Sequence, residues 1–421
     1  MSGEWRVRLP CPQCAAPVDL DAGDPVFRCG YCRTGLYLAS SGPLRYRMAP
    51  GGEPVEEADR LYLPFWRIRG VRYRMLASPP SVEGRLLDAT LPAYAEGLPE
   101  PRLGIRPQVA PLRLDAPGGE VLAVDRPAQQ ALRLAEDRAE RLHDRPPLLT
   151  RLVGERTCLL LVPCRLERQG DGWRLRELLP GGEAHPVDPA RAEALRGGRF
   201  RGRATPAARF LPLLCPECGS DLPAAPGAAA LVCGRCARAW WARGAGYAPL
   251  PYAVCPASGT DVRHFPFWQI AFRPRGLPAA NRAELRRWAV SYQPVPPGWE
   301  RQPCQVFVPA FQLPPSGFLR LARAISLAPL EVPSASGGLP GRFDGEPVRL
   351  PLPEAVQALQ VTLAHLARGA RDAFETVASA ELRVRRARLV YLPFRRGRRE
   401  WIEEATGTAL PIASVEHGAR L

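Results

Sequence analysis

Apolar and polar residues alternate in short runs along most of this chain, and Pro or Gly interrupts the runs at short intervals. This pattern predicts antiparallel strands and not the alternating strand–helix units of a parallel sheet. Two stretches instead repeat apolar residues at three- and four-residue steps, near Pro127 to Leu142 and near Pro353 to Leu366. Each stretch predicts a helix that lies on a sheet. The predicted fold class is therefore α+β and mainly β.

The same series of elements occurs twice. Cys11-Pro-Gln-Cys14 returns as Cys215-Pro-Glu-Cys218, and Cys29-Gly-Tyr-Cys32 returns as Cys233-Gly-Arg-Cys236, at a constant offset of 204 residues. Further pairs follow in one order: Leu63–Ile68 with Phe265–Ile270, Leu91–Tyr94 with Val308–Phe311, the two helical stretches, Leu159–Pro163 with Leu389–Pro393, and Trp173 with Trp401. We infer an internal duplication, in which each half has a body with one main helix.

The repeat boundaries divide the chain into four predicted segments. These are a zinc ribbon at 1–48, a β-rich body at 49–204, a second zinc ribbon at 205–250 and a second body at 251–421 that repeats the first. The stretch from Gly181 to Arg209 is rich in Gly, Pro and Arg, and we expect it to be the linker between the halves.

Eight of the twelve cysteines form two groups with the spacing of metal ligands. Two Cys-x-x-Cys turns on facing hairpins supply four thiolates in the tetrahedral arrangement that Zn²⁺ prefers. We therefore expect two structural zinc ions, although a rubredoxin-like iron centre uses similar turns and remains an alternative. The predicted ligands are Cys11, Cys14, Cys29 and Cys32 in the first group and Cys215, Cys218, Cys233 and Cys236 in the second.

A net charge of +15 at pH 7 would ordinarily suggest a phosphate-bearing partner. The chain contains no Lys, so Arg supplies all 57 basic residues, and this indicates coding bias as much as function. The densest basic cluster surrounds the strand Leu389–Phe394, and we expect a hairpin to bring its two groups together near the aromatic residues Tyr391, Phe394 and Trp401. The possible anion or nucleic-acid contacts are Arg383, Arg385, Arg386, Arg388, Arg395, Arg396, Arg398 and Arg399.

The sequence contains no motif of a catalytic centre. Its five His residues form no metal-binding pair, and no Gly-rich loop precedes a helix in the way that a nucleotide site requires. His264 stands where the first half has Tyr62, so a structural aromatic position is the favoured interpretation. A nucleophile pair of Cys255 and His264 is the alternative. We therefore expect a protein that is not an enzyme.

The first ten residues are charged at Glu4, Arg6 and Arg8 and lack the apolar core of a secretory signal. The longest apolar runs are also far shorter than the roughly 20 residues that a membrane-spanning helix needs. We expect a cytoplasmic protein without a transmembrane segment.

The first ribbon leads into Leu36-Tyr-Leu38, Leu44-Arg-Tyr46 and Leu61-Tyr-Leu-Pro-Phe-Trp66. Over these residues the chain resembles bacterial zinc-ribbon proteins of poorly defined function, in which a double Cys-x-x-Cys ribbon precedes a Leu-Pro-Phe-Trp strand. The resemblance implies a bound metal and a ribbon fold for this stretch, and it implies no activity.

Taken together, the sequence favours a non-catalytic zinc-binding accessory or scaffold protein that contacts an unidentified protein partner in a larger assembly. A nucleic-acid-binding zinc-ribbon protein is the first alternative, and a rubredoxin-like electron-transfer protein with iron is the second.

Overall fold

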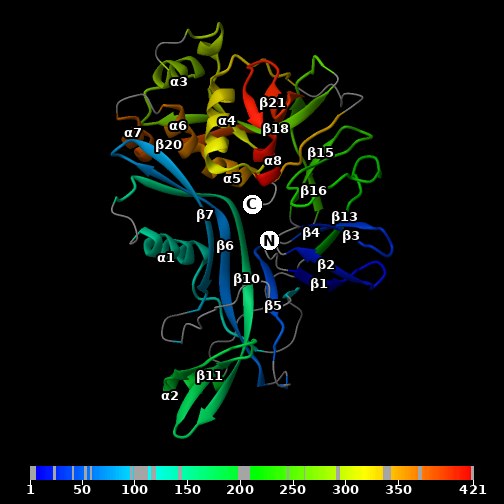
Figure 1. Ribbon diagram of the computed structural model, residues 1–421, viewed down its shortest axis with the longest axis vertical. Coiled ribbons are helices and arrows are strands. Elements are labelled where there is room, and N and C mark those ends of the chain that lie inside the picture. The colour runs from blue at the N-terminus through cyan, green and yellow to red at the C-terminus, as the bar shows by residue number, and fades with distance from the viewer. Residues whose placement is uncertain are drawn as a thin grey trace. The chain divides into compact units, whose positions relative to one another are not determined.

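The structure is a computed structural model (Figure 1). It describes residues 6–21, 25–39, 42–51, 55–56, 59–94, 98, 112–114, 120–140, 145–197, 209–243, 246–259, 261–290, 294–334, 343–367 and 372–418. Strands hold 43% of the residues and helices 21%, so the prediction of a mainly β fold is confirmed.

The chain forms two compact units, and each unit is assembled from several stretches of sequence. Unit 1 contains residues 1–69, 88–143 and 156–212, and unit 2 contains residues 70–87, 144–155 and 213–421. Two stretches that precede the second group of cysteines thus fold as part of unit 2.

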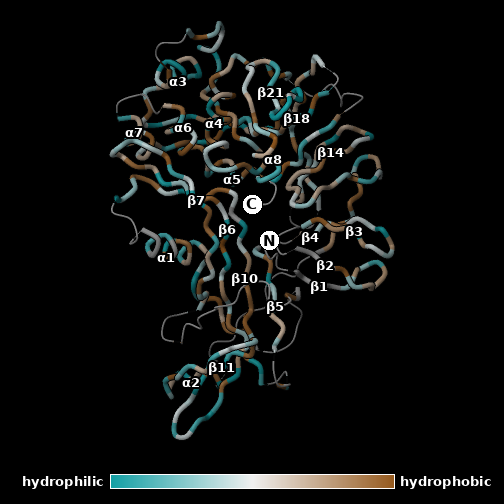
Figure 2. The backbone as a smooth tube through the Cα atoms, viewed as in Figure 1, coloured by the Kyte–Doolittle hydropathy of each residue, from teal (hydrophilic) through white to brown (hydrophobic). Residues whose placement is uncertain are grey.

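The main sheet of the first half is centred on two long strands, β6 (Leu61–Leu76) and β10 (Leu149–Gln169), which pair with each other. The apolar run from Leu159 to Val162 lies on β10 and is buried, and part of this strand is brown in Figure 2. The other elements of this half are β1 (Arg6–Pro10), β2 (Pro17–Asp21), β5 (Leu44–Met48), β7 (Ser81–Pro92), β8 (Leu112–Leu114), β9 (Glu120–Val121), α1 (Ala128–Glu140), β11 (Gly172–Glu177), β12 (Ala184–Val187) and α2 (Pro189–Arg196).

The sheet of the second half is centred on β18 (Val262–Arg275) and β20 (Glu381–Arg396), which pair along their whole length. Its other strands are β17 (Tyr252–Val254), β19 (Cys304–Pro309), β21 (Glu400–Glu403) and β22 (Ala409–Pro411). Its helices are α3 (Arg282–Ala289), the 3-10 helix η2 (Trp299–Arg301), α4 (Pro315–Leu327), α5 (Leu352–Gln357), α6 (Leu359–Leu366), α7 (Ala373–Ser379) and α8 (Ile412–Gly418).

Strand pairing is equivalent in the two halves. β10 pairs with β5, β6 and β11, and β11 pairs with β12, which leads into α2. In the same way β20 pairs with β17, β18 and β21, and β21 pairs with β22, which leads into α8. The pairings β5·β10 and β17·β20 are both parallel.

Individual hydrogen bonds also recur at equivalent positions. Trp66 Nε1 donates to Arg126 O at 2.7 Å, and Trp268 Nε1 donates to Leu350 O at 2.8 Å. Ala93 N donates to Pro64 O, and Ala310 N donates to Pro266 O, both at 2.9 Å. Shared pairing and shared irregular hydrogen bonds together show two similar halves, as an internal duplication predicts.

Each unit has its own apolar core. In unit 1 the core includes Leu63, Phe65 and Leu160, and in unit 2 it includes Phe265, Phe267 and Trp268. The Pro-Phe-Trp strands therefore supply core residues, because their aromatic rings are at most 7% exposed.

The prediction of one main helix for each half does not describe the structure. The two predicted helices are present as α1 and as the pair α5 and α6, but α3, α4, α7 and α8 also lie in the second half. The apolar stripe predicted for α6 is wider than expected, because Val361, Thr362 and Ala364 are also buried. The expected linker likewise contains two regular elements, β12 and α2.

The equivalent indole hydrogen bonds predict equivalent losses of stability. We expect Trp66→Phe and Trp268→Phe each to lower the free energy of unfolding by roughly 1–3 kcal/mol, because a buried carbonyl loses its donor and a small cavity forms. Urea denaturation followed by far-UV circular dichroism measures the change. The matched control is Trp240→Phe. Trp240 is also buried, at 8% exposed against 7% for Trp66 and 1% for Trp268, but its Nε1 has no hydrogen-bond partner. An equal loss in the control would contradict the role given to the two bonds.

Candidate metal centres

Each predicted group of four cysteines is assembled from two turns. In the first group, Cys11 and Cys14 lie between β1 and β2, and Cys29 and Cys32 lie between β3 (Val26–Arg28) and β4 (Gly35–Ala39). In the second group, Cys215 and Cys218 follow β13 (Arg209–Pro212), and Cys233 and Cys236 lie between β14 (Leu231–Val232) and β15 (Ala239–Arg243), which pairs with β16 (Gly246–Pro249). Within each group, all four sulfur atoms lie within 4.8 Å of one another. The structure therefore brings together all eight predicted ligands in two sets of four.

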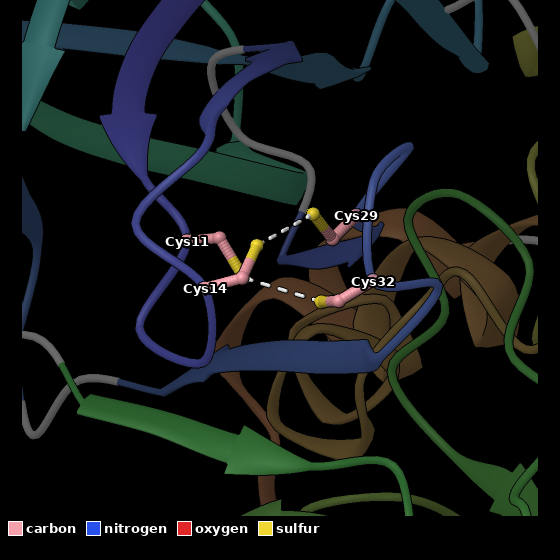
Figure 3. Close-up of side chains that lie close together, drawn as sticks. All are labelled: Cys11, Cys14, Cys29 and Cys32. Carbon is pink, nitrogen blue, oxygen red and sulfur yellow. Dashed lines mark hydrogen bonds between the residues drawn. The ribbon is translucent and has the colours of Figure 1, made fainter.

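The sulfur spacing fits a single tetrahedral ion. In the first group Cys11 Sγ lies 3.8 Å from Cys32 Sγ, and Cys14 Sγ lies 3.7 Å from Cys29 Sγ (Figure 3). The corresponding distances in the second group are 3.5 Å and 3.6 Å. Metal–sulfur bonds of about 2.3 Å place the sulfurs of a regular tetrahedron about 3.8 Å apart. Disulfide bonds are excluded, since bonded sulfurs would be about 2.05 Å apart.

The backbone of every Cys-x-x-Cys turn has the same hydrogen bonds. In the first turn Cys11 N donates to Ala16 O at 2.8 Å, and Ala15 N donates to Cys11 O at 2.8 Å. The turns that begin at Cys29, Cys215 and Cys233 repeat both bonds at 2.8–3.0 Å. This closure points the two thiols of each turn to one side, as a shared ion requires.

The residue after the second cysteine of each turn has a left-handed backbone. The φ angles are +60° at Ala15, +61° at Arg33, +69° at Gly219 and +54° at Ala237. Only Gly219 adopts this conformation without strain from a Cβ atom. Gly30 and Gly234, which follow the first cysteine of their turns, have no positive φ.

Two hydroxyl residues act on the thiols and were not predicted from the sequence. The Thr34 hydroxyl lies 3.4 Å from Cys32 Sγ, and hydrogen bonds from the Thr34 side chain and backbone lower the pKa of Cys32 to about 6. Ser220 lowers the pKa of Cys218 to about 6 in the same manner. Each group therefore has one thiol that favours the thiolate at neutral pH, which is the form that binds metal.

Burial of the ligands suits a structural metal. Cys11, Cys29, Cys215 and Cys233 are buried, while their partners in each turn lie nearer the surface. Among the residues that the structure describes, no His, Asp or Glu joins either group. Four sulfurs complete a tetrahedron, so this donor set suits an ion held for folding. Zinc and iron both fit it.

The other four cysteines lie apart from the metal centres. Cys164, Cys255 and Cys304 are buried and Cys158 is half-buried, and all four thiols are free. Burial raises the pKa of Cys255 to about 11. His264 is 2% exposed, and burial lowers its pKa, so this imidazole stays neutral. Both ring nitrogens of His264 are without a hydrogen-bond partner, and the Cys255 thiol donates to Glu331 O at 3.9 Å, so the described residues contain no hydrogen bond between this thiol and the imidazole.

The predicted arginine cluster is divided in the structure. Arg383, Arg385, Arg386 and Arg388 lie near the start of β20, and Arg395 and Arg396 lie at its end with Arg398 and Arg399 in the following turn. Six residues of continuous strand lie between Arg388 and Arg395, so the seven residue steps separate these two arginines by about 23 Å. The expected hairpin between the groups is therefore wrong. The aromatic residues Tyr391, Phe394 and Trp401 are at most 8% exposed, so they lie in the core and offer no stacking surface.

No protein family, curated protein or solved structure matches this chain. The resemblance to bacterial zinc-ribbon proteins rests on the cysteine spacing and the Leu-Pro-Phe-Trp motif, and the geometry of the two four-cysteine groups is compatible with zinc-ribbon sites.

In the part of the chain that the structure describes, no helix combines the length and apolar character needed to cross a membrane.

The left-handed turn positions predict opposite effects of exchanging Gly and Ala. We expect Gly219→Ala to weaken metal binding at the second site, because an Ala in this conformation costs about 1 kcal/mol, or about fivefold in affinity. Ala15→Gly should strengthen the first site by a similar factor. Competition with a chromogenic chelator measures both. Gly234→Ala is the control, since this Gly has no positive φ and no atom within 4 Å of an added Cβ. A fivefold loss there would contradict the backbone explanation.

Proposed function

We propose that this protein is a cytoplasmic, non-catalytic zinc-binding scaffold in which two structural zinc ions hold two ribbons that contact a protein partner. The observation that supports this proposal most strongly is the presence of two four-sulfur groups of tetrahedral spacing at equivalent places in a duplicated fold. Zinc is the ion we expect, because ribbons with four cysteines bind it in many proteins.

The tip of the first ribbon offers a surface suited to a protein contact. Tyr31 lies between the ligands Cys29 and Cys32, and its side chain is 71% exposed, the highest value among the exposed large hydrophobic residues described. Its neighbour Gly30 has no atom within 4 Å of an added Cβ, so the backbone beside Tyr31 is also open. Tyr is enriched at the energetic centres of protein interfaces.

The metal would make this tip rigid. Tyr31 is fixed by the two ligands on either side, and the backbone bonds of Cys29 with Thr34 and Arg33 close the turn. A backbone held in place before binding loses little conformational entropy when the partner arrives. The second ribbon has Arg235 at the equivalent position, where its Nη1 lies 3.4 Å from Ser220 Oγ.

This difference between the ribbons gives a test of the scaffold proposal. We expect the wild-type protein, purified from its native host under mild conditions, to recover a partner protein that Tyr31→Ser recovers at least about tenfold less, because an interface anchor contributes at least about 1.4 kcal/mol. Arg235→Ser should retain the partner, and both variants should keep two metal ions. A wild-type protein that purifies alone and is monomeric in solution would refute the proposal.

The iron alternative rests on the same sulfur geometry, since iron also binds four thiolates. It predicts a coloured protein with reversible redox behaviour. Colourless protein with zinc in both sites would remove the electron-transfer function.

A further inference from the structure

The end of the β18–β20 pair carries a concentration of arginines that the metal centres do not explain. We define the arginine ribbon as Arg273 and Arg275 of β18 together with Arg383, Arg385 and Arg386 of β20. All five side chains are exposed. We propose that the arginine ribbon binds the phosphate backbone of duplex nucleic acid.

The positive charges of the arginine ribbon are largely uncompensated by acidic residues. Glu381 is the acidic residue within reach, and it lies 3.6 Å from Arg275 and 3.4 Å from Arg383. Arg273, Arg385 and Arg386 form no ion pair with any residue that the structure describes. Five cations therefore share one carboxylate, which leaves four positive charges on a short length of strand.

Two of these cations also face each other directly. Arg273 lies opposite Arg383 in the register of the two strands. Like charges at directly opposed positions destabilise a sheet. An anion between the two guanidinium groups would remove this repulsion and gain two charge-assisted hydrogen bonds.

The equivalent positions of the first half show that the scaffold does not require arginine here. With Trp66 aligned to Trp268, Arg273 corresponds to Val71 and Arg275 corresponds to Tyr73. Tyr73 is 1% exposed and belongs to the core of unit 2, where its ring lies 6.1 Å from that of Phe318. Arg275 is 69% exposed. The two halves therefore use these two positions differently, and only the second half places cations at both of them.

The shape of the arginine ribbon favours double-stranded nucleic acid as its partner. Among the described strands, residues 273–275 of β18 and residues 381–383 of β20 pair only with each other, because β19 starts with Cys304 opposite Phe272 and runs away from this end, and β17 meets β20 only from Leu389 onward. Arg386 lies opposite Ala271, at the edge of this two-stranded segment, where β19 also pairs with β18. A two-stranded ribbon has the width that the major groove of DNA admits. Phosphate contacts by Arg position such a ribbon without reading a sequence.

Other anionic partners fit the ribbon less well. Single-stranded nucleic acid is bound through exposed aromatic rings, and Tyr391 and Phe394, the aromatic residues of β20, are buried. A membrane surface requires apolar side chains that enter the lipid, and Val384, at 38% exposed, is the large apolar residue exposed on the ribbon.

The test measures binding of a fluorescently labelled 20-base-pair DNA duplex to the zinc-loaded full-length protein by anisotropy between 50 and 200 mM salt. The triple variant Arg273→Gln/Arg385→Gln/Arg386→Gln should bind at least about tenfold more weakly at low salt, and its salt dependence should fall by about one for each arginine removed. The matched control is Arg395→Gln/Arg398→Gln/Arg399→Gln, which removes the same charge at the other end of β20. The control should stay within about twofold of the wild type, because its arginines lie outside the ribbon.

Three results would overturn the proposal. The first is no duplex binding by the wild type at 50 mM salt, and the second is an equal loss in both triple variants, which would mean that net charge alone is responsible. The third is binding to vesicles of anionic lipid without binding to the duplex. Circular dichroism and metal content establish that each variant is folded. The test is independent of the scaffold proposal, since it leaves Tyr31 and all eight ligands unchanged.

Discussion

The placement of four cysteine sulfurs within 4.8 Å of one another, a spacing that fits one metal ion, is the constraint on which each ribbon depends. The ribbon strands are short, since β3 has three residues and β14 has two, and they bury too little apolar surface to stay folded alone. Structural zinc supplies roughly 10–16 kcal/mol in small peptides, which exceeds the strain of three non-Gly residues in left-handed conformations. The first group of cysteines also fixes the start of the second. Strand β4, which follows Cys32, pairs with β13, and Cys215 comes three residues after the end of β13.

Duplication supplies the framework around these centres, and divergence between the copies supplies the candidate binding surfaces. The indole hydrogen bonds of Trp66 and Trp268 and the parallel pairing of β5 and β17 are common to both halves. Other positions differ between the halves, since Tyr31 corresponds to Arg235 and the buried core residue Tyr73 corresponds to the exposed Arg275. Tyr31 and Arg275 are therefore exposed side chains that one half has and the other lacks at the equivalent position.

The sequence predicted the two four-cysteine groups and the repeated strands well, because cysteine spacing and Pro-Phe-Trp motifs are local signals. It did not predict features that depend on tertiary contacts. Helix α3 is rich in Arg, yet Arg282 is 3% exposed and donates to Ala328 O while Arg286 donates to Leu327 O, so both cations satisfy the carbonyl end of α4. Helix α2 lies in a stretch that composition marked as a linker. The arginine cluster was expected to converge, but β20 continues without a turn between its two groups.

X-ray absorption spectroscopy of the purified protein tests most directly the central claim that each four-cysteine group holds one metal ion. The account predicts two zinc ions for each chain and a first coordination shell of four sulfur atoms at about 2.3 Å, with no oxygen or nitrogen ligand. Protein that binds no metal after reduction, or a shell that mixes sulfur with oxygen or nitrogen, would contradict the claim that these cysteines form closed structural centres.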